Sequence, residues 1–123
     1  MSKKVIANAL LLADTAVFGM QEKKAHQIVK IDLTKLNAAV ADYFVICHGD
    51  SSTQVEAIAD SVEEEIRKKT GEKPYGREGQ RNAQWILLDY VNVVVHIFLK
   101  DNRDFFGIED LWGDGIFTRY EEE

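Results

Sequence analysis

One hairpin constrains the fold of this chain more than any other feature of its sequence. The segment Trp85–Leu99 has the composition of two strongly apolar strands joined by a very short turn. If Val91 and Asn92 form that turn, Tyr90 lies opposite Val93, and this pairing sets the register of the whole hairpin. Side chains then alternate between two faces.

The two faces of the predicted hairpin differ in chemistry. One face is uniformly apolar and is predicted to lie in the core; it comprises Ile86, Leu88, Tyr90, Val93, Val95, Ile97 and Leu99. The opposite face combines large apolar groups with a carboxylate and an imidazole; it comprises Trp85, Leu87, Asp89, Val94, His96 and Phe98. Such a mixture suits contact with a second protein better than a sealed interior or open water.

Length, charge and cysteine content narrow the class of protein. The 123 residues suit one domain that buries roughly two-thirds of its unfolded surface. A net charge of −6 argues against binding along a nucleic-acid backbone, which depends on Lys and Arg. The same charge suits a basic protein partner, or it simply keeps the chain soluble. Cys47 is the only cysteine, which excludes an internal disulfide and a cysteine-based zinc site.

The first twenty or so residues predict an amphipathic helix rather than a signal peptide. Apolar residues recur there at three- and four-residue spacing: Ile6, Ala9, Leu10, Ala13, Val17 and Met20. Gly19 lies near the expected end of this helix. No apolar run in the chain approaches the ~20 residues that cross a bilayer. We therefore expect a cytoplasmic protein without membrane contact.

The middle of the chain predicts two strands and a helix. His26–Leu33 alternates like a half-buried strand, and Tyr43–His48 is apolar enough for a strand buried on both faces. Ser51 with Gln54, or Thr53 with Glu56, has the spacing of a capping box, and Gly71 is a natural helix end. The buried stripe of this helix is predicted to comprise Val55, Ile58, Ala59, Val62 and Ile66.

The last part of the chain predicts a third helix that starts at Asp101 or Asp104 and ends at Gly113. We expect at least one of Phe105 and Trp112 to anchor it to the sheet. The order of elements predicts an α/β fold, a sandwich of helices packed on a mixed sheet. We expect a single domain over residues 1–115 and an acidic C-terminal tail over 116–123, frayed from Thr118 onward.

Catalytic chemistry finds little support in the sequence. Gly49–Ser52 is a turn that opens a helix and could hold an anion, but it has no P-loop lysine or glycine spacing, and a helix cap explains it better. Cys47 and His96 could pair as nucleophile and base, yet a thiol inside an apolar strand stays protonated. The three histidines have no metal-ligand spacing. We expect no enzyme activity, no cofactor and no metal.

Six segments together resemble the ribosomal silencing factor family, also called Iojap, in its order and spacing over roughly residues 5–115. They are Ala41–Cys47, Gly49-x-Ser-Ser52, Gly76-x-Glu-Gly79, Trp85–Asp89, Val94–Phe98 and Leu111-Trp-Gly-Asp114. The resemblance implies a mixed α/β fold related to nucleotidyltransferases, without transferase activity. It also implies binding to the fourteenth protein of the large (50S) ribosomal subunit, which blocks joining of the small subunit when nutrients are short.

The predicted contact with that partner comprises Trp85, Leu87, Asp89, His96, Phe98, Leu111 and Trp112. Trp85, Leu87 and Phe98 would supply apolar anchoring, Asp89 an ion pair and His96 a polar contact. The family usually has Gly-Asp where this chain has Val91-Asn92. A β-branched residue resists positive φ, so either the turn changes type or the register slips and exchanges the two faces.

Three alternatives stay open from the sequence. One is an adaptor for large-subunit assembly that leaves joining intact, and another is a vestigial nucleotidyltransferase that uses the Gly49–Ser52 turn. The free protein could also form a homodimer.

Overall fold

The computed structural model describes residues 3–37, 39–79 and 82–122, with side chains from Asn8 onward. The elements are α1 (Lys3–Glu22), β1 (His26–Asp32), β2 (Tyr43–Gly49), α2 (Ser52–Thr70), β3 (Gly76–Glu78), β4 (Trp85–Asp89), β5 (Val93–Leu99), α3 (Lys100–Phe106), α4 (Ile108–Leu111) and β6 (Ile116–Arg119). The predicted α/β architecture with a mixed sheet is confirmed.

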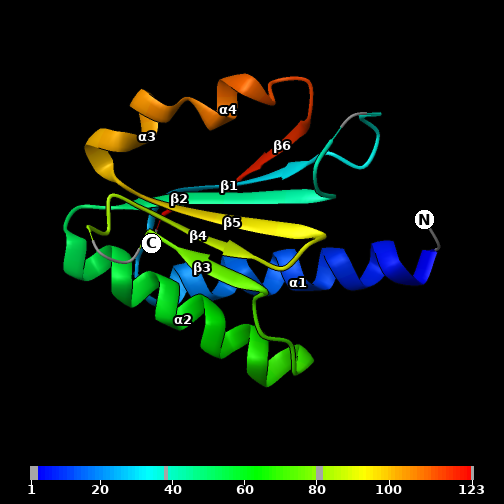
Figure 1. Cartoon of the computed structure of the whole chain (residues 1–123), viewed down its shortest axis with the longest axis horizontal. Coiled ribbons are helices and arrows are strands. Elements are labelled where there is room, and N and C mark those ends of the chain that lie inside the picture. Colours follow the sequence, from blue (N-terminus) through cyan, green and yellow to red (C-terminus); the bar gives the residue numbers. More distant parts are fainter. Residues whose placement is uncertain (1–2, 38, 80–81, 123) are drawn as a thin grey trace.

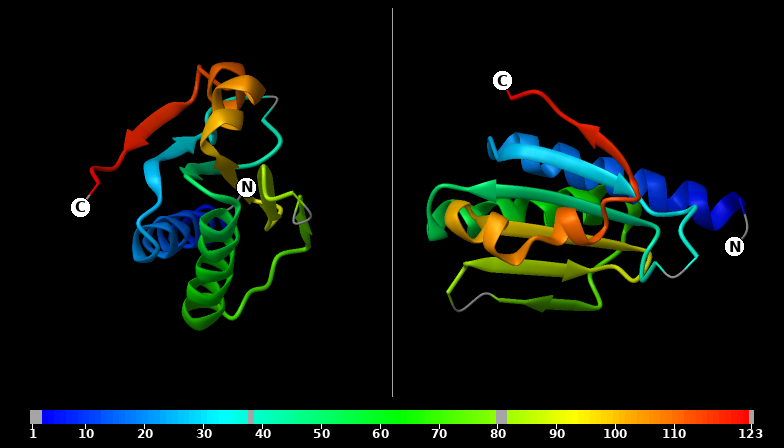
Figure 2. Two further views of the ribbon diagram at one scale, coloured as in Figure 1. Left: turned by 90° about the vertical axis from the view of Figure 1, so that its left-hand side faces the viewer. Right: turned by 90° about the horizontal axis from the view of Figure 1, so that it is seen from above.

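The six described strands form one sheet in the order β3-β4-β5-β2-β1-β6. Neighbouring strands are antiparallel except β2 and β5, which run parallel at the centre of the sheet. Helices α1 and α2 lie side by side against one face, and the short helices α3 and α4 lie over the other (Figures 1 and 2). We call these sides of the sheet the α1 face and the α3 face.

The main core fills the space between the α1 face and its two helices. Strand β2 is buried along its whole length, as predicted for a strand covered on both sides. The predicted stripe of α2 is also buried, with Ser61 in addition. In α1, however, Leu10 is 38% exposed, while Leu12 and Ala16 are buried instead.

Gly19 lies inside α1, a few residues before the helix ends at Glu22. Its lack of a side chain lets α1 and α2 approach each other closely. A Cβ at Gly19 would lie 2.8 Å from the Cα of Val62 in α2. The hydroxyl of Ser61 donates a hydrogen bond to the Gly19 carbonyl oxygen at 2.8 Å. Any larger residue at position 19 would therefore push α1 and α2 apart.

The hairpin keeps its predicted register despite its unusual turn. Ile86 pairs with Ile97 and Leu88 with Val95. Val91 has a φ of 72°, and the Asn92 N–H bonds the Tyr90 carbonyl at 2.9 Å, which together make a γ-turn. The turn thus changes type while the two faces stay as predicted.

The end of the chain departs from prediction in two ways. The last helix begins after Leu99, without a side-chain cap, and breaks into α3 and α4 at Gly107, whose φ is 60°. The expected frayed tail is wrong for the residues described, because β6 pairs with β1 and Tyr120 N–H bonds the Ile28 carbonyl. A short strand of mixed polarity at a sheet edge carries too weak an alternation to be recognised in the sequence.

Candidate functional site

The α3 face carries all seven residues of the predicted contact. Pleating sends Trp85, Leu87 and Asp89 of β4 to this side, along with His96 and Phe98 of β5. Helices α3 and α4 cover the middle of the sheet, so the hairpin side of this face is only partly covered (Figure 2). Leu87, Asp89 and Val94 are half-buried there, without the full burial of the α1 face.

Trp85 occupies an aromatic niche at the start of β4. Its indole stacks on Phe98 at 5.1 Å between ring centroids and meets Phe106 of α3 at 4.6 Å. The indole Nε1–H donates a hydrogen bond to Nδ1 of His96 at 3.1 Å. The residue is nevertheless only half-buried, so some of its surface stays open to solvent.

His96 and Phe98 lie beneath this surface rather than on it. They are 3% and 1% exposed, because Phe44, Trp85 and Phe106 pack against them. Burial lowers the pKa of His96 to about 4, so the imidazole is neutral at pH 7. The expectation that these two residues touch a partner directly therefore needs correction, since in this arrangement they support Trp85 from below.

Asp89 is placed for a polar contact at the end of β4. One carboxylate oxygen accepts a hydrogen bond from the Val91 N–H at 2.8 Å, which fixes the side chain beside the turn. Glu78 on β3 lies opposite Leu87 and is exposed on the same face. The half-buried apolar strip therefore has carboxylates along its side.

The short helices add exposed apolar groups to the α3 face. Leu111 is 72% exposed, whereas Trp112 packs edge-on against Phe44 of β2 at 5.8 Å. Trp112 is thus the anchor that the sequence predicted. Phe105, the other candidate, is 80% exposed, and its neighbour Phe106 contacts the sheet instead.

Phe105 and Phe106 were missed as surface residues because the sequence predicted one unbroken helix, whereas α3 ends at Gly107. A single helix through residue 113 would have continued one apolar stripe. The signal available in the sequence was the pair of adjacent aromatics, of which only one can face the sheet in a helix. We add both residues to the candidate surface.

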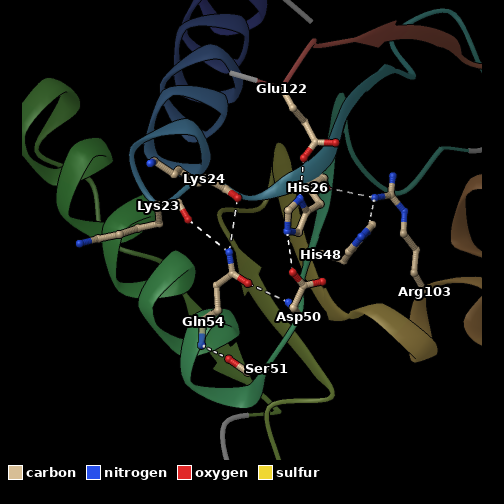
Figure 3. Close-up of polar contacts among 9 residues, drawn as sticks. All are labelled: Lys23, Lys24, His26, His48, Asp50, Ser51, Gln54, Arg103 and Glu122. Atoms are coloured by element: carbon tan, nitrogen blue, oxygen red, sulfur yellow. Dashed lines mark hydrogen bonds and ion pairs between the residues drawn. The ribbon is translucent and has the colours of Figure 1, made fainter.

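A second candidate is the polar cluster around the Gly49–Ser52 turn (Figure 3). Ser51 caps α2 by accepting the Gln54 N–H at 3.1 Å, as its spacing predicted. The Gln54 side chain reaches the Asp50 N–H and the carbonyl oxygens of Lys23 and Lys24. The cap interpretation of this turn is therefore confirmed.

Two histidines of this cluster are each paired with neighbouring groups. The His26 ring bonds Glu122 at Nδ1 (2.5 Å) and Asp50 at Nε2 (2.8 Å), and the bond to Glu122 is the main cause of its raised pKa. His48 accepts a hydrogen bond from Arg103. The pKa of His48 is lowered, mainly by burial and to a lesser extent by the positive charge of Arg103.

Arg103 also binds both carboxylate oxygens of Glu109. These hydrogen bonds and ion pairs connect β1, β2, α3 and the C-terminal segment. The charged side chains of the cluster are therefore paired with one another.

Neither a metal nor a nucleophile stands out in the part of the chain that the structure describes. No group of three or more His, Cys, Asp or Glu residues is arranged there to hold a metal ion. Cys47 is buried, and burial raises the pKa of its thiol well above the usual range. Within the described ranges, no helix is long and apolar enough to cross a membrane.

Comparison with known proteins agrees with these features. The family model described as "Ribosomal silencing factor during starvation" matches residues 6–123. Proteins named ribosomal silencing factor RsfS are 40% identical over 103 residues in Halalkalibacterium halodurans (84% of this chain and 86% of that protein) and over 99 residues in Bacillus subtilis (80% and 82%). The chloroplastic Iojap protein of Arabidopsis thaliana is 32% identical over 74 residues (60% and 30%).

A solved structure has the same fold. The crystal structure of a Chromobacterium violaceum protein superposes with a TM-score of 0.75 at 33% sequence identity and covers 92% of this chain and 88% of that one. The family match over nearly the whole length, the relatives at 40% identity and the shared fold all point the same way. This chain belongs to the ribosomal silencing factor family.

Proposed function

We propose that this protein represses translation in the cytoplasm by binding the large ribosomal subunit and sterically blocking the small subunit from joining. The partner we propose is the fourteenth protein of the large subunit, and the setting is nutrient limitation. The observation that carries the proposal is the partly covered α3 face, where Trp85, Leu87 and Leu111 leave apolar surface open to solvent.

The chemistry of this face suits a basic ribosomal protein. Half-buried apolar residues lie beside the carboxylates of Asp89 and Glu78, and the chain has a net charge of −6. Apolar anchors at the centre with charges at the rim are the usual anatomy of a protein interface. Charge complementarity should speed the encounter and make binding weaken as salt rises.

Occlusion requires no catalytic step. A standard interface removes about 800 Å² of surface from each partner. If that area is needed by the small subunit, occupying it is sufficient to prevent joining. The paired state of the polar cluster around Asp50 supports a binding protein over a transferase.

Sedimentation with separated ribosomal subunits tests the proposal. We expect the protein to travel with large subunits and not with small ones, and to reduce formation of joined ribosomes from purified subunits. Binding without any effect on joining would favour the assembly adaptor. Nucleotide turnover in the presence of magnesium would favour the vestigial transferase.

A matched pair of variants locates the surface. Leu111→Ala and Leu11→Ala remove the same atoms from exposed leucines, 72% and 42% accessible, on opposite sides of the sheet. We expect Leu111→Ala to weaken binding to large subunits and Leu11→Ala to leave it unchanged. The reverse result would assign the docking surface to α1.

A further inference from the structure

We propose that His96 is a positioning residue that fixes the orientation of the Trp85 indole on the α3 face by accepting its N–H at Nδ1. This inference rests on the proposed function, in which Trp85 is an anchor for the ribosomal partner. It assigns His96 a role different from direct contact.

The direction of the hydrogen bond fixes the state of the imidazole. An indole nitrogen only donates, so Nδ1 of His96, 3.1 Å away, must be an unprotonated acceptor. The proton of the neutral ring then lies on Nε2. This nitrogen is buried, and among the described residues it has no hydrogen-bond partner.

Because its Nε2–H has no partner in the described part of the chain, His96 lowers the stability of the folded state at this position. A buried donor without an acceptor destabilises the folded state, whereas an aliphatic side chain in the same place would carry no such penalty. What histidine provides at this position is the acceptor at Nδ1. Among the residues that the structure describes, the group that uses this acceptor is the Trp85 indole.

The imidazole is itself held in place by aromatic neighbours. Phe44 meets it edge-on at 4.7 Å, and Phe98 lies nearly parallel to it at 6.2 Å. These contacts give Nδ1 a fixed direction. A fixed acceptor can orient a neighbouring side chain more strictly than a mobile one.

Stacking alone would not select one orientation of the indole. Phe98 and Phe106 contact the ring at 5.1 and 4.6 Å, but the torsion that turns the ring has two broad minima. The hydrogen bond to His96 is satisfied in only one of them. A pre-oriented anchor loses less conformational freedom on binding, so the bond should increase affinity for the partner.

Two variants with the same branching separate positioning from packing. In His96→Asn the side-chain oxygen stands near the place of Nδ1 and can accept the indole N–H. In His96→Leu the shape is similar but the acceptor is gone. A nitrogen–proton NMR spectrum shows one indole N–H resonance for each of the two tryptophans. The resonance that disappears in Trp112→Phe belongs to Trp112, so the remaining one belongs to Trp85 and reports on the hydrogen bond.

We expect His96→Leu to move the Trp85 resonance toward that of a free indole and to weaken binding to large subunits roughly tenfold, the effect of one hydrogen bond. Its melting temperature should equal or exceed that of the natural chain. We expect His96→Asn to keep the resonance near its original position and to keep most of the affinity.

Two results would overturn the inference. An unchanged Trp85 resonance in His96→Leu would show that the bond does not orient the indole, regardless of the affinity measured for large subunits. A shifted resonance with undiminished binding would show that the orientation is irrelevant to docking. Failure of the natural chain to bind large subunits is a separate result, which counts against the proposed function.

Discussion

The two faces of the β4–β5 hairpin differ in how completely helices cover them. On the α1 face, Ile86, Leu88, Val95 and Ile97 are completely buried beneath two long helices. On the α3 face, His96 and Phe98 are buried, but Trp85, Leu87, Asp89 and Val94 are covered only in part, and the helices on this side have seven and four residues. The same two strands therefore supply the core with one side and a candidate binding surface with the other, so substitutions on the two sides should have separable effects.

The largest expected effect is on the α1 face. Ile97→Ala should lower the free energy of unfolding by roughly 2–5 kcal/mol, because the cavity forms in a site with no exposure. Chemical denaturation measures this loss. Variant protein that stays folded should still bind large subunits, and a loss of binding by fully folded protein would break the separation between the faces.

Trp85→Ala tests the opposite face. Binding to large subunits should weaken by about 2 kcal/mol or more if the indole is a hot spot. The fold should persist, because the side chain is only half-buried. Quantitative sedimentation measures the affinity and circular dichroism checks the fold. If the variant unfolds, Trp85 belongs to the core and the comparison between the faces fails.

Val91→Gly concerns the turn that joins the two strands. Positive φ strains a β-branched residue, and glycine relieves this at a small cost in chain entropy, so stability should rise by about 1 kcal/mol. Thermal unfolding measures the change. Binding should be unaffected, since the register stays the same. A loss of stability would mean that the valine side chain packs better than its 52% exposure indicates.

The smallest effect should come from His26, at the edge of the sheet. The hydrogen bond to Glu122 raises the pKa of His26 above its usual value of 6.5. The charged imidazole therefore stabilises the fold, and this stabilisation is fully present when the pH is below 6.5. That stabilisation is lost as the pH rises through the higher folded-state pKa. The loss should be small, because the ion pairs are partly exposed.

Denaturation from pH 6 to pH 9 should therefore show a decline in stability that His26→Gln lacks. Ribosome binding should follow no such profile over this range. Identical profiles for the two proteins would remove His26 as the source.

Local patterns predicted the regular parts of the fold well. The α2 stripe, its Ser51 cap and its Gly71 end all follow from residue types at fixed spacing. Alternation favoured the observed hairpin register, because a one-residue slip would bury Asp89 and expose Leu88, but the Val91-Asn92 turn left that slip open until the structure decided it. The candidate surface was predicted only by face, since periodicity says which side a residue takes and not what covers that side.

The sequence by itself determined two strands with unlike faces, the helix α2 and the resemblance to a family. These depend on contacts close along the chain, where spacing and residue type decide the outcome. Tertiary structure decided the rest. The last helix breaks at Gly107, Phe106 packs against Trp85 while Phe105 is exposed, and β6 pairs with β1. Contacts between distant segments decide which of two similar faces is sealed, and no local pattern encodes them.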